Sequence, residues 1–404
     1  MNAAIMRIFI LLALFLVFTC KPTIEKKETS SFGDIHEQAI LVDTHNDVLL
    51  QIMEKGVVLD QDQNGVSHTD LQRLKKGGVD VQFFSVWCDG NQANPFEYSM
   101  IEMDSLDAVT NRNPDKIVQV ENIQEAMNVV GENKIAAFFG VEGGHMMENN
   151  LSKLDTLYNR GTRYMTLTWN NSTSWATSAS DETAEDGALN SDGKKGLTAF
   201  GKQIVHHMNT LGMMVDISHV GEQTFWDVIE TTAKPVIASH SSVYAICPVP
   251  RNLKDDQIRA IAKNGGVVQI NFYAGFIDPN YEGKRIAFML KHKIENDSLI
   301  KNGVNLYVAE EMLFSKYVTE VQSFRPTMDQ LVQHIVHVVD LVGVDYVGLG
   351  SDFDGIPLAP MGLDDVSSYP LITGALADRG YSTGEIHKIL GGNLLRVLKA
   401  NEEK

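Results

Sequence analysis

The sequence predicts an α/β protein that forms a single (β/α)8 barrel with long loops at its carboxyl face. From residue 35 onward, eight short apolar runs alternate with helix-like stretches. Most runs are continuous in Val, Ile, Phe and Met, as in parallel strands that are buried on both faces. Eight alternations favour one barrel over two domains. The runs are Ala39–His45, Val79–Trp87, Lys134–Glu142, Arg163–Trp169, Met213–His219, Pro235–His240, Gly266–Tyr273 and Tyr346–Asp352.

Amphipathic stretches between the runs predict the helices. Leu197–Leu211, Asp255–Lys263 and Thr327–Val342 carry apolar residues at helical spacing. Thr327 and Gln330 fit a capping box at the start of the third stretch.

Two connections are unusually long, Asn170–Lys195 and Ala274–Arg325. Loops of this length usually shape a site or a lid, and we expect both at the carboxyl face.

The composition excludes several classes of protein. Lysine plus arginine total 34 and aspartate plus glutamate 52, which gives a formal charge of −18. This balance, without a dense basic run, argues against a nucleic-acid partner. The 44% hydrophobic and 21% charged residues indicate a globular protein with a sizeable core. Three cysteines, Cys20, Cys88 and Cys247, provide no disulfide framework.

The N-terminus predicts export. After Arg7, residues 8–18 form an uncharged apolar run that is too short to span a bilayer and is typical of a secretory signal. The layout up to Cys20 resembles bacterial lipoprotein signals, and plain secretion is the alternative. We therefore expect a signal peptide at 1–19, a flexible tether at 20–34 and the barrel at 35–404. Contact with a membrane is expected only through a lipid on Cys20, with the protein facing the periplasm or the cell surface.

Charged and imidazole side chains close five of the predicted strands. Because the carboxyl ends of barrel strands meet at one mouth, we expect these side chains to converge there. Such a cluster needs a cation, and two divalent metals roughly 3.5–4 Å apart would satisfy it. Nitrogen and oxygen ligands suit zinc first, with manganese or iron as alternatives. The cluster comprises His45, Asp47, Glu142, His219, His240, Asp352 and Asp354.

Other polar residues have simpler interpretations. Asp43 and Asp216 precede the cluster and are suited to orienting their neighbours, and Asp354 before Gly355 fits a turn. His145 stays open. Surface or packing positions are expected for the remaining singled-out histidines, His206, His207, His334 and His337.

Motifs along the chain resemble those of the renal (membrane) dipeptidase family of metallopeptidases. They occur in family order between about Ile40 and Leu398, which is nearly all of the chain after the predicted tether. They are Asp43-Thr44-His45-Asn46-Asp47, His68-Thr69-Asp70-Leu71, Gly77-Gly78-Val79, Gly140-Val141-Glu142-Gly143-Gly144-His145, Asp216-Ile217-Ser218-His219, Ser239-His240-Ser241-Ser242, Arg251-Asn252-Leu253, Asn271-Phe272-Tyr273, Gly350-Ser351-Asp352-Phe353-Asp354-Gly355 and Gly391-Gly392-Asn393-Leu394-Leu395-Arg396.

The resemblance implies an amidohydrolase-type barrel with two zinc ions per chain. By this resemblance, His45 and Asp47 bind one zinc, His219 and His240 bind the other, and Glu142 bridges them. A hydroxide shared by two zincs is a strong nucleophile near neutral pH.

The resemblance also assigns roles in catalysis and substrate binding. Asp352 would be the catalytic proton shuttle, and Arg251 would receive the terminal carboxylate of the substrate. Tyr273 belongs to the substrate-binding set. The alternative for Arg251 is an ion pair with Asp255 or Asp256 on the surface.

One position departs from the family. A histidine that steadies the oxyanion commonly follows Leu167-Thr168, and here the residue is Trp169. Loss of such a donor costs about 3–4 kcal/mol. Three explanations remain. Trp169 or Asn170 donates the hydrogen bond in place of the histidine, the zinc provides most of the polarisation of the substrate carbonyl, or the preferred substrate differs from that of the family. We count both residues among the substrate-binding candidates.

The function predicted from the sequence is therefore a zinc dipeptidase that hydrolyses the peptide bond of small dipeptides. The family tolerates a D-residue on the carboxyl side of that bond. The alternatives are a related amidohydrolase acting on a non-dipeptide amide, and a non-catalytic surface lipoprotein that binds a ligand. Dimerisation is common in the family, and the sequence indicates no interface for a homodimer.

Overall fold

The computed structural model describes residues 32–185, 187–304 and 306–403. The predicted signal peptide, Cys20 and most of the tether lie outside these residues. The tether was expected to run to residue 34, but α1 (Phe32–Gln38) already begins at Phe32. Ile35 and His36 of α1 are buried. The folded body therefore begins slightly before the predicted boundary.

Eight parallel strands form the barrel, as the apolar runs predicted, and they pair in chain order. The interior strands are buried along almost their whole length because helices cover the outer face. The strands are β1 (Leu41–Asn46), β2 (Val79–Val86), β4 (Ile135–Glu142), β5 (Thr162–Thr166), β6 (Met214–Asp216), β7 (Ile237–Ala238), β8 (Val267–Ile270) and β9 (Val347–Leu349).

The barrel closes between its first and last strands. Asn46 forms a parallel bridge with Phe353, just after β9. The N–H of Asp47 donates to the carbonyl of Phe353 at 2.9 Å, and the N–H of Asp352 donates to the carbonyl of His45 at 3.0 Å. Closure therefore joins the two segments that carry His45, Asp47 and Asp352.

A further strand, β3 (Ile117–Gln119), was not predicted. It pairs with β4 at Ile135, along the edge that β5 occupies only from Phe139 onward. Three residues are too few to produce an apolar run in the sequence, and tertiary pairing defines this strand.

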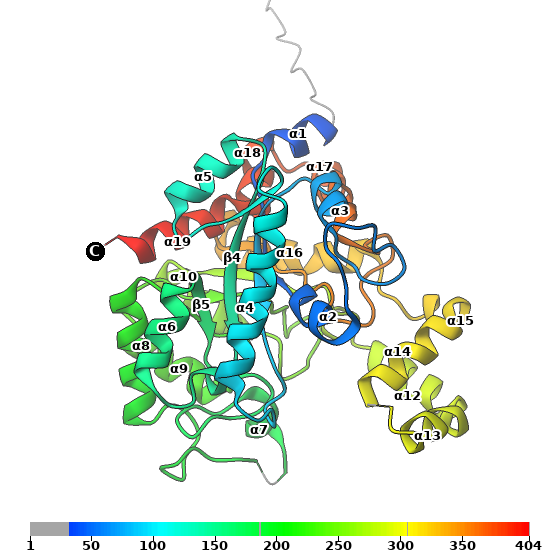
Figure 1. The fold of residues 1–404 in the computed structure, drawn as a ribbon, viewed down its shortest axis with the longest axis horizontal. Helices are drawn as coiled ribbons and strands as arrows, with labels where there is room; N and C mark the ends of the chain where they lie inside the picture. The colour runs from blue at the N-terminus through cyan, green and yellow to red at the C-terminus, as the bar shows by residue number, and fades with distance from the viewer. Residues whose placement is uncertain (1–31, 186, 305, 404) are drawn as a thin grey trace, which may run out of the picture.

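Helices cover the outside of the barrel (Figure 1). The three predicted stretches are confirmed within a few residues, and Thr327 with Gln330 forms the expected capping box. The covering helices are α2 (Val48–Lys55), α3 (Leu71–Lys76), α4 (Pro95–Arg112), α5 (Ile123–Gly131), α6 (Leu151–Asn159), α8 (Ala199–Leu211), α9 (Glu222–Thr231), α10 (Asp255–Asn264), α16 (Met328–Val342), α17 (Pro370–Asp378), α18 (Thr383–His387) and α19 (Asn393–Glu402).

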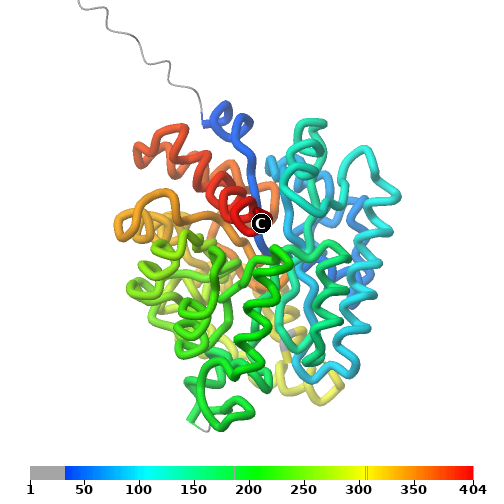
Figure 2. Tube along the Cα trace, turned by 90° about the vertical axis from the view of Figure 1, so that its left-hand side faces the viewer, coloured from blue at the N-terminus to red at the C-terminus, as the bar shows by residue number. Residues whose placement is uncertain are grey.

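The two long connections lie at the end of the barrel opposite α1. The connection after β5 carries the short α7 (Ala179–Thr183), at the bottom of Figure 1. Helix α1 packs against α17 and α18 at the other end, as Figure 2 also shows. The mouth formed by the carboxyl ends of the strands therefore faces away from α1.

The connection between β8 and α16 is mostly helical rather than an extended loop. We call residues 274–325 the helical excursion. Tyr281, Phe288 and Phe314 are part of its own small apolar core. Its helices are α11 (Ala274–Ile277), α12 (Tyr281–Lys291), α13 (Lys293–Lys301), α14 (Leu306–Lys316) and α15 (Val318–Gln322).

The barrel interior is filled by aromatic and aliphatic side chains. Phe83 stacks on Phe138 at 4.9 Å and on Tyr164 at 5.6 Å between ring centroids. Truncation of a buried Phe typically costs about 3–5 kcal/mol, so this stack fixes the strands beneath the mouth.

Among the described residues, no helix combines the length and the apolar character needed to cross a bilayer.

Candidate metal centre

The structure brings the predicted ligands together at the barrel mouth. His45 lies in β1 and Glu142 ends β4, while His219 and His240 follow β6 and β7. None of the four is more than 9% exposed. The convergence predicted from the strand ends is therefore confirmed as a spatial cluster.

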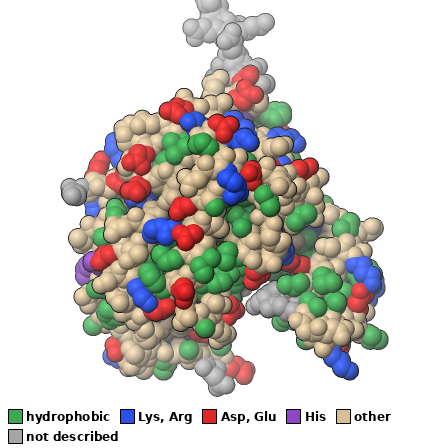
Figure 3. All heavy atoms as spheres, viewed as in Figure 1, with side chains coloured by type: hydrophobic (Ala, Val, Ile, Leu, Met, Phe, Trp, Pro, Cys, Tyr) green, Lys and Arg blue, Asp and Glu red, His purple; other side chains and the backbone are tan. Residues whose placement is uncertain are grey.

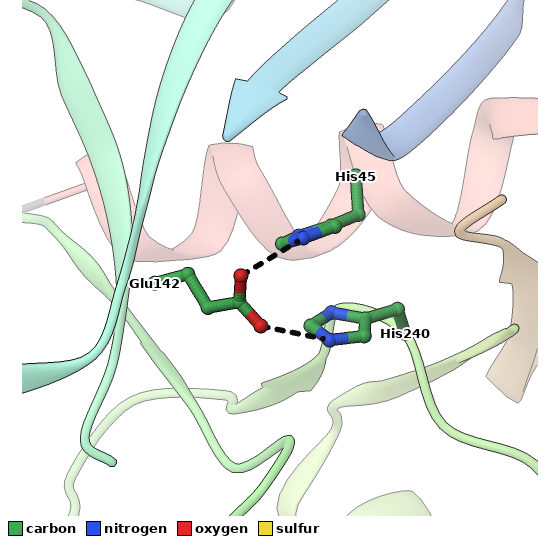
Figure 4. Close-up of side chains that lie close together, drawn as sticks. All are labelled: His45, Glu142 and His240. Atoms are coloured by element: carbon green, nitrogen blue, oxygen red, sulfur yellow. Dashed lines mark ion pairs between the residues drawn. The ribbon is translucent and has the colours of Figure 1, made fainter. Parts of the chain in front are cut away.

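Glu142 occupies the centre of this cluster. Its Oε1 lies 2.8 Å from His219 Nε2 and 3.3 Å from His240 Nε2, while its Oε2 lies 3.4 Å from His45 Nε2. Figure 4 shows the carboxylate between His45 and His240, with one oxygen directed at each ring. The two oxygens thus face different histidines, which is the arrangement expected of a bridging carboxylate.

Hydrogen bonds fix the tautomer of His45. Its Nδ1 lies 2.8 Å from the Tyr164 hydroxyl, and that hydroxyl donates to the carbonyl of Thr44 at 2.9 Å. Because the hydroxyl proton is already used, Tyr164 must accept from the Nδ1–H of His45. His45 Nε2 therefore carries a lone pair, and this buried atom has no hydrogen-bond partner among the described residues.

The other two histidines are oriented in the same way. Ser239 donates its hydroxyl proton to Asp216 Oδ2 at 2.6 Å and lies 2.7 Å from His240 Nδ1, from which it accepts. His219 Nδ1 lies 3.1 Å from the amide oxygen of Asn170. Both Nε2 atoms therefore present lone pairs, although they lie only 3.0 Å apart. This orientation of histidines by outer partners is typical of metal sites.

The carboxylates of Asp47 and Glu142 favour a positive charge beside His45 Nε2. Burial alone would lower the pKa of His45, but Tyr164 and the charges of Asp47 and Glu142 hold that pKa well above its usual value. Burial lowers the pKa of His219 to about 4 and that of His240 well below its usual value. Neutral His219 and His240 are thus available as ligands. At His45 the surrounding carboxylates favour a positive charge, which a metal ion would supply in place of a proton.

Glu142 itself remains ionised. Burial opposes its charge, but the charge of His45 and the close contacts with the Nε2 atoms of His219 and His240 hold the pKa of Glu142 well below its usual value. Three buried imidazole nitrogens around one buried carboxylate fit a zinc ion.

A second group of possible ligand atoms adjoins the first. His45, Asp47 and Asp352 offer ligand atoms within 4.8 Å of one another, with His45 Nε2 lying 3.4 Å from Asp47 Oδ2. Asn271 donates to Asp352 Oδ2 at 2.8 Å. Burial and the nearby charge of Asp47 raise the pKa of Asp352 well above its usual value. The two groups share His45 and therefore lie side by side at the barrel mouth.

Unusual backbone conformations occur beside these ligands. His219, Asp352 and Asp354 have φ values of 65°, 63° and 68°, in the left-handed region that non-glycine residues rarely adopt. A Cβ at Gly355 would collide with the carboxylates of Asp47 and Asp352. Such strain is maintained at functional sites, where the surrounding structure compensates for it.

Arg251 lies next to the cluster and not on an acidic surface. It donates from Nη1 to Ser241 Oγ at 2.8 Å and from Nη2 to the carbonyl of His240 at 3.0 Å. Its buried Nε has no partner among the described residues, and burial lowers its pKa to about 10. Asp255 pairs with His337 at 2.8 Å instead. The pairing of Arg251 with Asp255 or Asp256 that the sequence left open is therefore wrong.

The remaining substrate-binding candidates differ in position. The Trp169 ring lies 6.5 Å from the His219 ring. Asn170 uses its side-chain oxygen on His219, so it orients this ligand. Tyr273 packs against Phe276 and Tyr281, at 4.9 and 5.6 Å between ring centroids, at the base of the helical excursion. Its contact with substrate stays a prediction.

The polar residues with simpler interpretations have structural roles. Asp43 accepts from the N–H and hydroxyl of Ser351, both at 2.8 Å, and Asp216 accepts from Ser239. His207 pairs with Asp155 on the surface, and His145 Nε2 bonds to the carbonyl of Cys88. Cys88 and Cys247 are free, buried thiols.

Tyr164 is the functional residue that sequence reasoning missed. It lies in β5 opposite Gly140 of β4, and a Cβ at Gly140 would collide with the tyrosine ring. A glycine at this position was visible in the sequence as part of a motif, but its pairing with Tyr164 depends on strand register. Only the structure assigns the tyrosine to His45.

A buried cluster of histidines and carboxylates at the mouth of an amidohydrolase-type barrel defines the class of metal-dependent hydrolases. The model of the family "Membrane dipeptidase (Peptidase family M19)" matches residues 29–404. An uncharacterized dipeptidase of Schizosaccharomyces pombe is 36% identical over 401 residues, covering 94% of this chain and 85% of the relative. The chain therefore belongs to the membrane dipeptidase family, M19, and is a metallopeptidase of this family.

Solved structures show the same fold. The "probable dipeptidase PvdM" from Pseudomonas aeruginosa superposes with a TM-score of 0.75 at 23% identity, over 92% of this chain and 98% of that one. A metallo peptidase from Rhodobacter sphaeroides, liganded with a phosphinate mimic of the dipeptide L-Ala-D-Ala, superposes with a TM-score of 0.72 at 22% identity. This superposition covers 90% of this chain and 99% of that one.

Proposed function

We propose that this protein hydrolyses the single peptide bond of dipeptides with two zinc ions at the barrel mouth. His45 and Asp47 would hold one ion, and His219 and His240 would hold the other. Glu142 would contribute one carboxylate oxygen to each ion. The observation that carries the proposal is the inward orientation of three Nε2 lone pairs around one carboxylate, with every Nδ1 bonded to an oxygen. When bound, the ions supply Lewis acidity and a water whose pKa falls from ~15.7 to about 7.

The side chains of this protein would perform the remaining steps. Asp352 takes a proton from the attacking water and delivers it to the leaving amine, while Asn271 holds its Oδ2 in place. Arg251 receives the carboxylate of the dipeptide beside His240. Because the Arg251 guanidinium bonds to the backbone of the proposed ligand His240, it favours a substrate whose carboxylate lies one residue beyond the scissile bond.

The carboxyl-side residue of the substrate is proposed to be accepted in the D as well as the L configuration. The family resemblance and the phosphinate mimic of L-Ala-D-Ala bound by the Rhodobacter sphaeroides relative support this proposal. Peptides derived from cell walls and scavenged peptides would both supply such substrates.

Metal content and hydrolysis, measured on the same preparation, test the function. We expect about two zinc ions per chain and chelator-sensitive cleavage of L,L and L,D dipeptides. N-acyl amino acids serve as the competing substrate class, and preferential cleavage of these would replace the dipeptidase proposal. Failure to retain any divalent metal would refute the metal centre itself.

Asp352→Asn tests the proton shuttle. This variant should retain its zinc and lose turnover. Unchanged turnover would remove Asp352 from the mechanism.

We also propose that the protein is exported and anchored by a lipid on Cys20. The apolar run before Cys20 supports this proposal. Labelling with radioactive palmitate, followed by fractionation, tests it. The label should appear in the membrane fraction and disappear in Cys20→Ala, and soluble, unlabelled protein would favour plain secretion.

A further inference from the structure

Two tryptophans form an aromatic wall beside the metal pocket. Trp87 follows β2 and Trp169 lies just beyond β5, on the two strands that flank β4 and its Glu142. Their ring centroids are 4.9 Å apart, with an interplanar angle of 62°. Both side chains are half-buried. The wall therefore keeps part of its aromatic surface exposed beside the metal pocket.

The wall is fixed in place from several sides. The Asn171 side chain packs so closely on Gly90 that a Cβ there would collide with it. Asn170, next to Trp169, holds His219 through its side chain and accepts from the Ser178 hydroxyl at 2.7 Å through its carbonyl. These contacts hold the segment that carries Trp169 against the loop after β2 and against His219.

The wall offers apolar surface and no positive charge. The indole N–H of Trp87 is buried and has no nitrogen or oxygen partner among the described residues, and its ring packs against that of Trp169. An indole cannot carry the full charge of an imidazolium. Aromatic side chains bind apolar and aromatic groups through large buried areas and edge-to-face contacts.

Two histidines, His219 and His240, lie between the wall and Arg251. Trp169 lies beside His219, the rings of His219 and His240 are 5.0 Å apart, and Arg251 bonds to the carbonyl of His240. A dipeptide whose carboxylate meets Arg251 would therefore place its amino-side residue near the wall.

We propose that Trp87 and Trp169 form an apolar subsite that selects dipeptides with a large apolar or aromatic residue on the amino side of the scissile bond. This inference rests on the dipeptidase function proposed above. Apolar pockets discriminate side chains that differ by one methylene by roughly 10–200-fold. For the larger change from alanine to phenylalanine, we expect a preference of at least about tenfold.

The first test compares kcat/KM for phenylalanyl-alanine, leucyl-alanine, alanyl-alanine and aspartyl-alanine with the zinc-loaded full chain. Wild-type protein should prefer the phenylalanyl substrate to the alanyl one. Trp169→His should reduce this ratio about tenfold while the zinc content stays the same. The matched control is Trp226→His on α9, outside the mouth, which should leave the ratio unchanged. Trp87→Leu is the second variant if Trp169→His does not fold.

Binding supplies a readout that does not depend on turnover. The chain contains four tryptophans, and two of them form the wall. A phosphinate mimic of phenylalanyl-alanine should quench the intrinsic fluorescence, and a mimic of alanyl-alanine should quench it less. Trp169→His should abolish the difference.

The outcomes separate the inference from the function on which it rests. Equal kcat/KM for phenylalanyl and alanyl substrates, or an unchanged ratio in Trp169→His, would overturn the subsite and leave the dipeptidase intact. If the zinc-loaded protein cleaves no dipeptide, the proposed function fails. The quenching experiment then decides the subsite alone, and equal quenching by both mimics overturns it.

Discussion

The barrel mouth and the helical excursion differ in where their charged side chains lie and in what they bond to. At the mouth, the charges are buried, and Tyr164, Ser239 and Asn170 orient them by hydrogen bonds. On the excursion, the charges pair with each other at the surface, as Lys293 does with Asp297. Buried charges without partners are costly, whereas surface ion pairs contribute little. Function is therefore expected to depend on the mouth and to be tolerant of change on the excursion.

Apolar side chains show the reverse contrast. On the excursion, Leu290 is 66% exposed and Ile294 is 90% exposed. Figure 3 shows apolar side chains beside lysine and arginine side chains on this part of the molecule. At the mouth, by contrast, the two tryptophans Trp87 and Trp169 are half-buried and pack against each other. The four changes below test the contrast between the two regions.

Glu142→Gln should have the largest effect. An amide cannot bridge two cations with two anionic oxygens, so we expect the bound metal to fall and hydrolysis to drop by roughly 10³-fold or more. Metal analysis and dipeptide turnover measure both. The matched control on the excursion is Glu295→Gln, which removes an ion pair with Lys316 and should change neither value. Full metal content in Glu142→Gln would contradict the bridging role.

His334 joins α16 to the base of the excursion, and its titration should control acid stability. Its Nδ1 accepts from the N–H of Val243 at 3.1 Å, and its Nε2 lies 3.2 Å from the carbonyl of Ile277. Burial lowers the pKa of His334 to about 4 from the usual 6.5; the hydrogen bond to the Ile277 carbonyl opposes this shift, and the nearby His337 adds to it.

The direction of the pH effect follows from this depressed pKa. The unfolded chain binds the proton first as the pH falls, so this group costs no stability above about pH 6.5. Between about pH 6.5 and 4 it costs up to about 3 kcal/mol. Urea unfolding across this window should show a shallower decline in His334→Gln than in wild type. Identical slopes would show that the imidazole does not titrate as expected.

Tyr164→Phe should weaken metal binding without destroying the pocket. Removal of the acceptor for His45 Nδ1–H frees the imidazole to change tautomer, and loss of such an outer partner typically costs about 10–100-fold in metal affinity. Competition with a chromophoric chelator measures the change. On the excursion, Tyr317→Phe removes a hydroxyl bond to Glu295 and provides the control, with no expected change in affinity. Equal affinities for Tyr164→Phe and wild type would refute the orienting role.

Lys293→Ala should have the smallest effect. The ion pair with Asp297 spans one helical turn at the surface, where its side chains are 61% and 56% exposed. Such pairs contribute about 0.3–0.5 kcal/mol. Chemical unfolding should therefore place the variant within about 0.5 kcal/mol of wild type. A larger loss would mean that the excursion is stabilised by its charges as strongly as the mouth.

The barrel strands could be predicted because each is an apolar run of its own. Burial on both faces leaves a signal within a few consecutive residues, and this signal identified all eight strands. β3 left no such signal, since three residues gain their strand conformation only by pairing with β4. The helices of the excursion were missed for a related reason. α14 mixes exposed Leu306 and Met312 with buried Leu313 and Phe314, so no clear apolar face is visible in its sequence.

The sequence by itself predicted which histidines and carboxylates lie close together and the end of the barrel where they meet. Histidines and carboxylates directly after parallel strands must converge, because all the strands point the same way. The tertiary structure decided how those ligands are used. Which nitrogen of each histidine faces Glu142 depends on Tyr164, Ser239 and Asn170, whose places are set by strand register and loop conformation. The pairing of Trp87 with Trp169 likewise joins two loops that are distant in the chain, and only packing brings them together.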